Sequence, residues 1–248
     1  MADAPVAHTP LGDLRGVFRD GIAAFHGVPY AEPPIGELRF APAAPVPAWS
    51  GLRDATSHGP IAPQPPPRLS ALVGRGSARP QDEDCLTLTI CTPAPDAKAR
   101  PVVVWLHGGA WLSGAGSLDR LDGSRLAREG DLVFVGVNYR LGALGWLQRP
   151  GIVDAEAGAS DMIAALSWVH ENIAGFGGDP GRVTVMGQSA GAGSIGRFLM
   201  LPAVRRLFGR FIMQSAPFGR ASIPSRRQRN WPIDSCGCSI SIRMRVMH

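Results

Sequence analysis

The stretch RVTVMGQSAGAGS occupies residues 182–194 and joins an apolar run to a run of small residues through Ser189. Its centre, from Gly187 to Gly191, fits the pattern G-x-S-x-G. A serine on a sharp strand-to-helix turn needs glycines two positions away on either side, because Cβ atoms there would clash. The serine Oγ then stands clear of the sheet, and the following helix directs its N-terminus at developing negative charge. The pattern alone is a weak signal in a chain with 31 glycines, so its context decides.

That context is a series of apolar runs separated by amphipathic ones. Continuous β-branched and apolar runs at residues 101–106 and 131–139 predict strands that are buried on both faces of a parallel sheet. Further strands are expected at 182–186 and 210–215. Alternating apolar and polar residues predict one more strand at 84–93. Short strands broken by glycine turns are expected over residues 11–30, and a proline- and glycine-rich surface loop over 31–80.

Helical patterns lie between these predicted strands. One short helix is expected to end at Gly130, and another runs over 190–201. A longer one has Ser160 as its N-cap and Gly175 as its C-terminal stop. Its apolar face consists of Ile163, Leu166, Val169 and Ile173. The alternation of strand and helix predicts an α/β fold with a central, mostly parallel sheet flanked by helices.

A second glycine-rich stretch, WLHGGAWLSGAG, occupies residues 105–116 directly after a predicted buried strand. Gly108 and Gly109 would let its backbone approach a substrate closely and donate N–H groups to an oxyanion. A plain glycine turn between strand and helix is the simpler interpretation of the same residues. His107 lies beside this loop rather than opposite Ser189, so a structural role is expected for it rather than that of a general base.

The bulk properties narrow the class of protein. The net charge of +5 comes entirely from residues 219–248, which contain six arginines and one acid, so a nucleic-acid-binding face is not supported. The chain shows no secretory signal and no apolar run long enough for a bilayer, which makes a soluble cytoplasmic protein the expectation. Cys236 and Cys238 are one residue apart without complementary ligands, so structural zinc is not expected.

Five sequence blocks in order resemble the type B carboxylesterases, the family of bacterial carboxylesterases and cholinesterases. The blocks are GIAAFHGVPYAEPPIGELRF at 21–40, EDCLTLTI at 83–90, HGGAW at 107–111, NYRLGALGWL at 138–147 and FGGDPGRVTVMGQSAG at 176–191. The resemblance implies an α/β-hydrolase fold and ester hydrolysis through an acyl-serine intermediate. It assigns Ser189 as the nucleophile and the backbone N–H groups of Gly109, Ala110 and Ala190 as the oxyanion hole. It implies a small-molecule ester substrate and neither metal nor organic cofactor.

Several positions depart from the family pattern. Thr89 stands where asparagine is usual, and Gln188 where glutamate is common, which removes a charge beside the nucleophile. Ala62 stands where secreted relatives often have the cysteine that bridges to the position of Cys85. Cys85 is therefore expected to be a free, buried thiol, in agreement with a reducing compartment.

The C-terminal segment is the most severe departure. Residues 10–218 resemble the N-terminal portion of the family, whereas the basic segment 219–248 does not, so the fold is expected to be truncated after the strand near Phe211. In the family, the triad acid and histidine follow the serine in a long C-terminal portion. Asp234 and His248 satisfy that order, but coincidence is the favoured interpretation, and the acid and base stay unassigned. Translation in another reading frame, or a fused foreign end, explains this segment better than a basic tail for membrane or nucleic acid.

Three functions are compatible with the sequence. The first is a serine esterase that is truncated and weakly active or inactive, and the second is a non-catalytic binding module on the same fold. The third is a fragment without function of its own. A chain that stops here would leave residues 211–214 as an unpaired apolar sheet edge, which predicts self-association.

Overall fold

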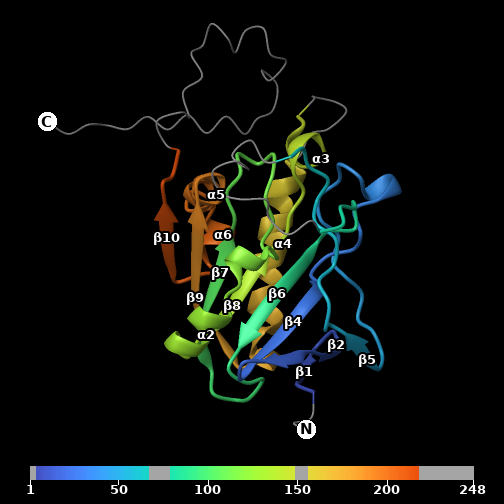
Figure 1. Ribbon diagram of the computed structural model, residues 1–248. Helices are drawn as coiled ribbons and strands as arrows, with labels where there is room; N and C mark the ends of the chain where they lie inside the picture. The colour runs from blue at the N-terminus through green and yellow to red at the C-terminus, as the bar shows by residue number, and fades with distance from the viewer. Residues whose placement is uncertain (1–3, 67–78, 149–155, 218–248) are drawn as a thin grey trace, which may run out of the picture.

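A seven-stranded sheet forms the centre of the computed structural model, which describes residues 4–66, 79–148 and 156–217 (Figure 1). The strand order is β10-β9-β7-β8-β6-β4-β3. β7, β8, β9 and β10 are parallel to one another, whereas β6, β4 and β3 extend the sheet antiparallel. The strands are β3 (Val17–Arg19), β4 (Ile22–Pro29), β6 (Thr87–Thr92), β7 (Arg100–Leu106), β8 (Val133–Val137), β9 (Gly178–Gln188) and β10 (Arg210–Gln214).

A smaller sheet of three strands lies toward the N-terminal end of the chain, in the order β1-β2-β5. Its strands are β1 (Val6–Thr9), β2 (Gly12–Arg15) and β5 (Leu52–Asp54). The short strands predicted for residues 11–30 are thus β2, β3 and β4. The described part of the predicted loop at 31–80 is mostly irregular, and it contains β5 and the 3₁₀ turn η1 (Gly36–Leu38).

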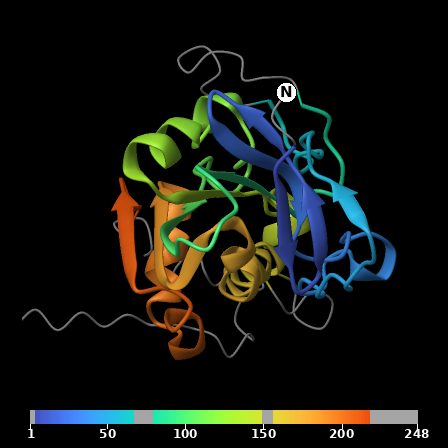
Figure 2. The ribbon, with the colours of Figure 1, turned by 90° about the horizontal axis from the view of Figure 1, so that it is seen from below.

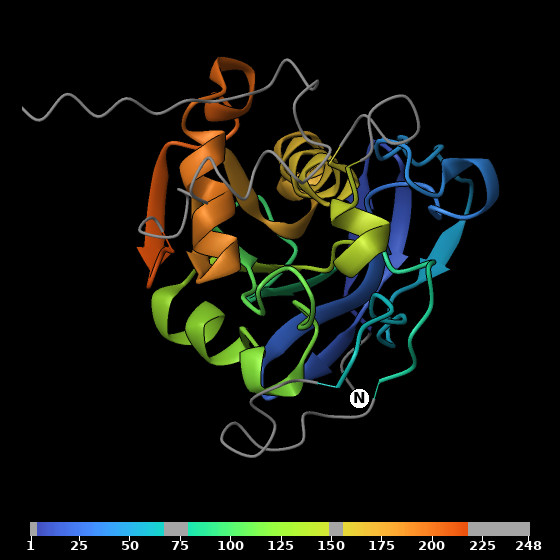
Figure 3. The same ribbon diagram turned by 90° about the horizontal axis from the view of Figure 1, so that it is seen from above.

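Helices cover both faces of the large sheet, which confirms the predicted α/β fold (Figures 2 and 3). α2 packs on one face against β4, β6 and β8, while α4 and α5 pack on the other face against β9. The α-helices of the described ranges are α2 (Ser124–Gly130), α3 (Gly142–Trp146), α4 (Ala157–Asn172), α5 (Ala190–Phe198) and α6 (Pro202–Arg205). The 3₁₀ turns η2 (Asp119–Leu121) and η3 (Ile173–Phe176) complete them. None of the helices in these ranges has the length and apolar character needed to cross a membrane.

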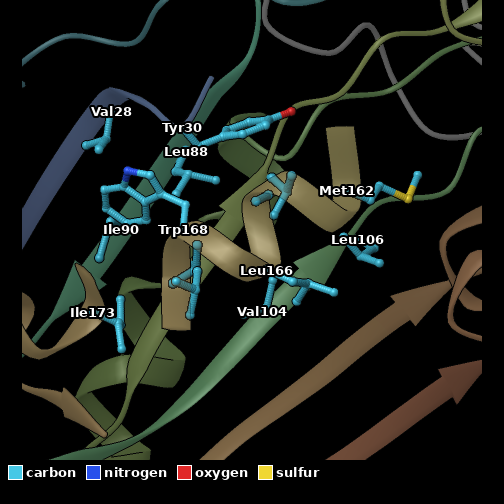
Figure 4. Close-up of a cluster of buried hydrophobic side chains, with 14 of the residues drawn as sticks. Val28, Tyr30, Leu88, Ile90, Val104, Leu106, Met162, Leu166, Trp168 and Ile173 are labelled. Carbon is cyan, nitrogen blue, oxygen red and sulfur yellow. The ribbon is translucent and has the colours of Figure 1, made fainter. Parts of the chain in front are cut away.

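The strands divide their side chains between two cores because successive residues of a strand point to opposite faces. In β7, Val102, Val104 and Leu106 are fully buried in the main core, whereas Val103 and Trp105 pack toward the α2 side. Figure 4 shows the main core, in which Leu166 and Trp168 of α4 meet the sheet residues. Burial on both faces is why these strands read as continuous apolar runs.

Both predicted ends of the long helix are wrong. α4 begins at Ala157 with Glu156 as its N-cap, and Ser160 lies in its first turn, where its Oγ accepts a hydrogen bond from the N–H of Ala43 (3.0 Å). At the other end, α4 ends at Asn172 and the backbone continues as η3. Gly177, which is left-handed with φ 80°, caps η3. Gly175 serves packing instead, since a Cβ atom there would lie 2.1 Å from the carbonyl oxygen of His8.

Candidate active site

Ser189 lies between the end of β9 and the start of α5, at the carboxyl ends of the parallel strands (Figure 1). Its backbone has φ 51° and ψ −114°, a sparsely populated conformation for a residue with a side chain. A Cβ atom on Gly187 would lie 2.7 Å from the carbonyl carbon of Gly191, and one on Gly191 would lie 2.1 Å from the carbonyl oxygen of Leu106. Gly187 is therefore required by the turn itself, and Gly191 by the close approach of α5 to the end of β7.

Hydrogen bonds hold the turn in place from both sides. The N–H of Ser189 donates to the carbonyl of Gln214 at the end of β10 (2.8 Å), and the carbonyl of Ser189 accepts from the N–H of Gly193 in α5 (2.8 Å). The strained serine is thus fixed between a strand and a helix, and its side chain is half-buried rather than enclosed.

The loop after β7 lies against this turn. A Cβ atom on Gly108 would lie 2.2 Å from Oε1 of Gln188, the residue before the serine. Left-handed backbone follows at Gly109 (φ 125°), Ala110 (φ 57°) and Trp111 (φ 58°). Three successive positive φ values turn the loop back on itself, and the carbonyl of Gly109 accepts hydrogen bonds from the N–H groups of Leu112 (3.0 Å) and Ser113 (3.1 Å).

Gln64 anchors the far end of the same loop. Its Oε1 accepts from the N–H of Gly114 (2.7 Å), and its Nε2 donates to the carbonyl of Gly114 (3.0 Å). No sequence motif indicates this role of Gln64, because Gln64 and Gly114 are 50 positions apart and nothing local in the sequence relates them.

The predicted oxyanion-hole residues lie on these two elements. Gly109 and Ala110 are in the loop after β7, and Ala190 is the first residue of α5. Among the described residues, none accepts a hydrogen bond from the N–H groups of these three residues. Free N–H groups beside a serine at a helix N-terminus can stabilise the negative oxygen of a tetrahedral intermediate.

His107 is buried beside the loop and holds it through packing and a hydrogen bond. Its side chain is 1 % exposed and stacks on Tyr139 with ring centroids 4.2 Å apart. Nδ1 donates to the carbonyl of Gly108 (2.8 Å), and the Tyr139 hydroxyl donates to the His107 carbonyl (2.7 Å). Burial lowers the pKa of His107 to about 4, so the imidazole is neutral at neutral pH. The ring is held as a packing element, as expected for a structural residue.

No general base is evident in the described part of the chain. His8 pairs with Asp13, and the rings of His26 and His58 stack on each other at 3.8 Å, while none of the histidines within these ranges is hydrogen-bonded to Ser189. The candidates Asp234 and His248 lie outside the described residues, as do Cys236 and Cys238.

The thiols of Cys85 and Cys91 agree with the expectation of free, buried cysteines. Cys85 and Cys91 are free and buried, and burial raises the pKa of both thiols, that of Cys91 to about 11. Residues 4–66, 79–148 and 156–217 bring no three His, Cys, Asp or Glu side chains together as a metal site.

Comparison with known proteins decides the family. The sequence model of the carboxylesterase family matches residues 3–235. The chain belongs to the carboxylesterase family. The match reaches into the segment 219–248, and the boundary near residue 218 stays a prediction.

Individual relatives agree with this assignment. The chain is 50 % identical over 220 residues to phenmedipham hydrolase of Pseudarthrobacter oxydans, covering 88 % of this chain and 44 % of that protein. It is 43 % identical over 213 residues to para-nitrobenzyl esterase of Bacillus subtilis (strain 168), covering 85 % of this chain and 43 % of that protein. This carboxylesterase chain thus spans less than half the length of these curated relatives.

Solved structures show the same α/β-hydrolase fold. A thermophilic PNB esterase matches with a TM-score of 0.78 at 40 % identity, over 86 % of this chain and 45 % of that one. A carboxylesterase of Geobacillus stearothermophilus matches with a TM-score of 0.76 at 44 % identity, over 84 % of this chain and 43 % of that one. The predicted α/β-hydrolase fold is confirmed, and the chain spans less than half the length of these solved chains.

Proposed function

We propose that this chain carries the nucleophile and the oxyanion hole of a carboxylic-ester hydrolase. The observation that supports the proposal most strongly is the strained backbone of Ser189, at φ 51°, beside free N–H groups from two elements. Strain of this kind persists only where surrounding structure maintains it, and it concentrates at functional sites.

The proposed reaction is acyl transfer to the serine. The Oγ of Ser189 would attack the ester carbonyl, and the N–H groups of Gly109, Ala110 and Ala190 would bind the oxygen that becomes negative. Collapse of the tetrahedral intermediate releases the alcohol and leaves an acyl group on Ser189, which water then hydrolyses. The acid and base of the triad are unassigned, and in their absence the serine hydroxyl stays protonated. An oxyanion hole alone still gives roughly 10³–10⁴-fold catalysis over water, so weak activity is expected.

The test is covalent labelling. A fluorophosphonate should label the wild-type chain, and Ser189→Ala should abolish labelling. The matched control is Ser57→Ala, because Ser57 is exposed and lies in a different loop. Slow hydrolysis of a short p-nitrophenyl ester should be lost in the same variant only. A chain that is neither labelled nor active would overturn the esterase proposal and leave a binding module or an inactive fragment.

We infer further that the partners of this chain are small esters and copies of itself. β10 is an edge strand within the described residues, and its Phe211 and Ile212 are 43 % and 46 % exposed. An exposed apolar edge is a template for pairing with another chain.

The charge and the thiols bear on other partners and on location. The even balance of charge outside residues 219–248 supports no nucleic-acid partner. The free thiols of Cys85 and Cys91 favour a reducing, cytoplasmic location.

A further inference from the structure

The two sources of the oxyanion-hole N–H groups lie on separate elements that must keep a fixed distance. Gly109 and Ala110 belong to the loop after β7, whereas Ala190 opens α5. Figure 1 shows this loop between α3 and α5 above the strand ends. A donor set divided between a loop and a helix acts on one oxygen only while the two elements hold their relative position.

The side chain of Trp111 bridges the two elements. Its indole Nε1–H donates a hydrogen bond to Oγ of Ser194 (3.1 Å), which lies inside α5 and is 1 % exposed. The Ser194 hydroxyl in turn donates to the carbonyl of Ala190 (3.2 Å). Because an indole N–H can only donate and a hydroxyl can both accept and donate, the direction of both hydrogen bonds is determined. They connect Trp111, the residue after Ala110, through Ser194 to Ala190, the residue after Ser189.

The surroundings of Trp111 fix the rest of its position. Its backbone is left-handed, and its carbonyl accepts from the N–H of Gly142 at the start of α3 (2.8 Å). The ring packs against Trp146, with centroids 5.4 Å apart. On the helix side, a Cβ atom on Gly193 would lie 3.3 Å from Cζ2 of the Trp111 ring, so glycine at 193 lets the ring lie close to α5.

The geometry points to Trp111 and Ser194 as positioning residues that lock the Gly109–Ala110 loop to the first turn of α5. The inference rests on the proposed function, because it deepens the role of the same site. The strained loop has three consecutive positive φ values, and the bridge from Trp111 restrains the last of them. Phenylalanine at 111 would keep the aromatic packing and lose only the donor.

Matched substitutions separate positioning from packing. Trp111→Phe and Ser194→Ala each break the bridge, and each should lower the fluorophosphonate labelling rate of Ser189 about tenfold. With a p-nitrophenyl ester, kcat should fall while KM stays constant, because substrate binding does not use the bridge. The double variant should be no slower than either single variant, since both remove one interaction. The control is Trp49→Phe, whose indole donates to the Asp13 carbonyl (3.1 Å) instead, and its labelling rate should equal that of the wild type.

A second measurement does not depend on activity. In Trp111→Phe and Ser194→Ala, the N–H groups of Leu112 and Ser113, which donate to the carbonyl of Gly109, should exchange with deuterium at least fivefold faster. The amides of β7 should be unchanged. Unchanged exchange in the loop, additive rate losses, or an equal loss in Trp49→Phe would each overturn the positioning role. A wild-type chain that is not labelled but shows faster exchange in the variants would overturn the proposed function alone.

Discussion

The N–H of Ser189 donates a hydrogen bond to the carbonyl of Gln214 at 2.8 Å, and so the candidate nucleophile is tied directly to the edge strand of the sheet. β10 pairs with β9 in parallel register, with Gln214 opposite Gln188. On its other side β10 has no partner strand among the described residues. Within the described residues, the strand that supports the elbow is therefore also an edge strand of the sheet, and the proposed self-association would act on this same strand.

Substitution on this edge should weaken self-association. Ile212→Lys places a charge on the exposed face of β10, where a second sheet edge would have to bury it. We expect the dissociation constant of the self-associated form, measured by analytical ultracentrifugation, to rise about tenfold, which corresponds to about 1.4 kcal/mol. Phe18→Lys is the matched control, because Phe18 is 43 % exposed on β3 at the opposite edge. Equal effects of both substitutions would show that association does not use β10.

The contact between the elbow helix and β7 should tolerate no added methyl group. Gly191→Ala would place its Cβ atom 2.1 Å from the carbonyl oxygen of Leu106 and 2.8 Å from that of His107. Since both obstacles are backbone atoms, α5 must move, and we expect a loss of about 1–3 kcal/mol in the free energy of unfolding. Labelling of Ser189 should fall with it.

Gly209→Ala provides the comparison for this clash. The nearest atom to its new Cβ would be the carbonyl oxygen of Val183 at 3.9 Å, an ordinary contact. Its effect on the free energy of unfolding in urea should stay within about 0.5 kcal/mol. A Gly191→Ala chain as stable as Gly209→Ala would contradict the close approach of α5 to β7.

The buried ion pair between Arg140 and Asp161 should affect the free energy of unfolding far more than the ion pairs at the surface do. Asp161 is fully buried in α4 and accepts from Nη2 (2.6 Å), Nε (2.9 Å) and the backbone N–H (3.0 Å) of Arg140. Asp161→Asn leaves the guanidinium buried without its counter-charge, so we expect a loss of about 3–5 kcal/mol in the free energy of unfolding. Glu129→Gln breaks the exposed pair with Arg125 and should cost below about 0.5 kcal/mol. Urea denaturation measures both losses. Equal losses in Asp161→Asn and Glu129→Gln would show that the buried pair stabilises the fold no more than the exposed one.

Residues that act through local conformation could be predicted from the sequence. The elbow at Ser189 and the glycine loop at 108–109 each leave a local signature, because a positive φ or a close backbone approach needs glycine at a fixed spacing. The central strands β7 and β8 are equally predictable, since packing on both faces makes their sequences apolar throughout.

Interactions between distant segments could not be predicted in the same way. The Arg140–Asp161 pair and the anchoring of Gly114 by Gln64 join residues 21 and 50 positions apart. The bridge from Trp111 to Ser194 spans 83 positions. The ends of α4 are wrongly predicted for a related reason. Ser160 and Gly175 are residue types that often cap helices, but here they make contacts with distant segments, at Ala43 and His8.

Buried histidines should make the fold sensitive to acid. Burial lowers the pKa of His26 to about 4 and that of His58 to about 3, and positive neighbours such as Arg19 and Arg79 add to the effect. In the unfolded chain both return to about 6.5, so the unfolded state binds more protons between pH 6.5 and pH 4. The free energy of unfolding therefore falls as the pH is lowered through that window and is restored above about 6.5.

His26→Phe tests this sensitivity, because the phenyl ring can keep the stacking on His58 and cannot titrate. Between pH 7 and pH 5 the wild type should lose on the order of 1 kcal/mol more stability than the variant, a figure reduced for solvent screening of the partly exposed His58. His8→Gln is the control, since His8 is exposed and pairs with Asp13 at the surface. Urea denaturation at the two pH values measures the difference. Parallel losses in the wild type and His26→Phe would show that the acid sensitivity arises elsewhere, with His107, buried and neutral beneath the loop at 108–111, the next residue to substitute.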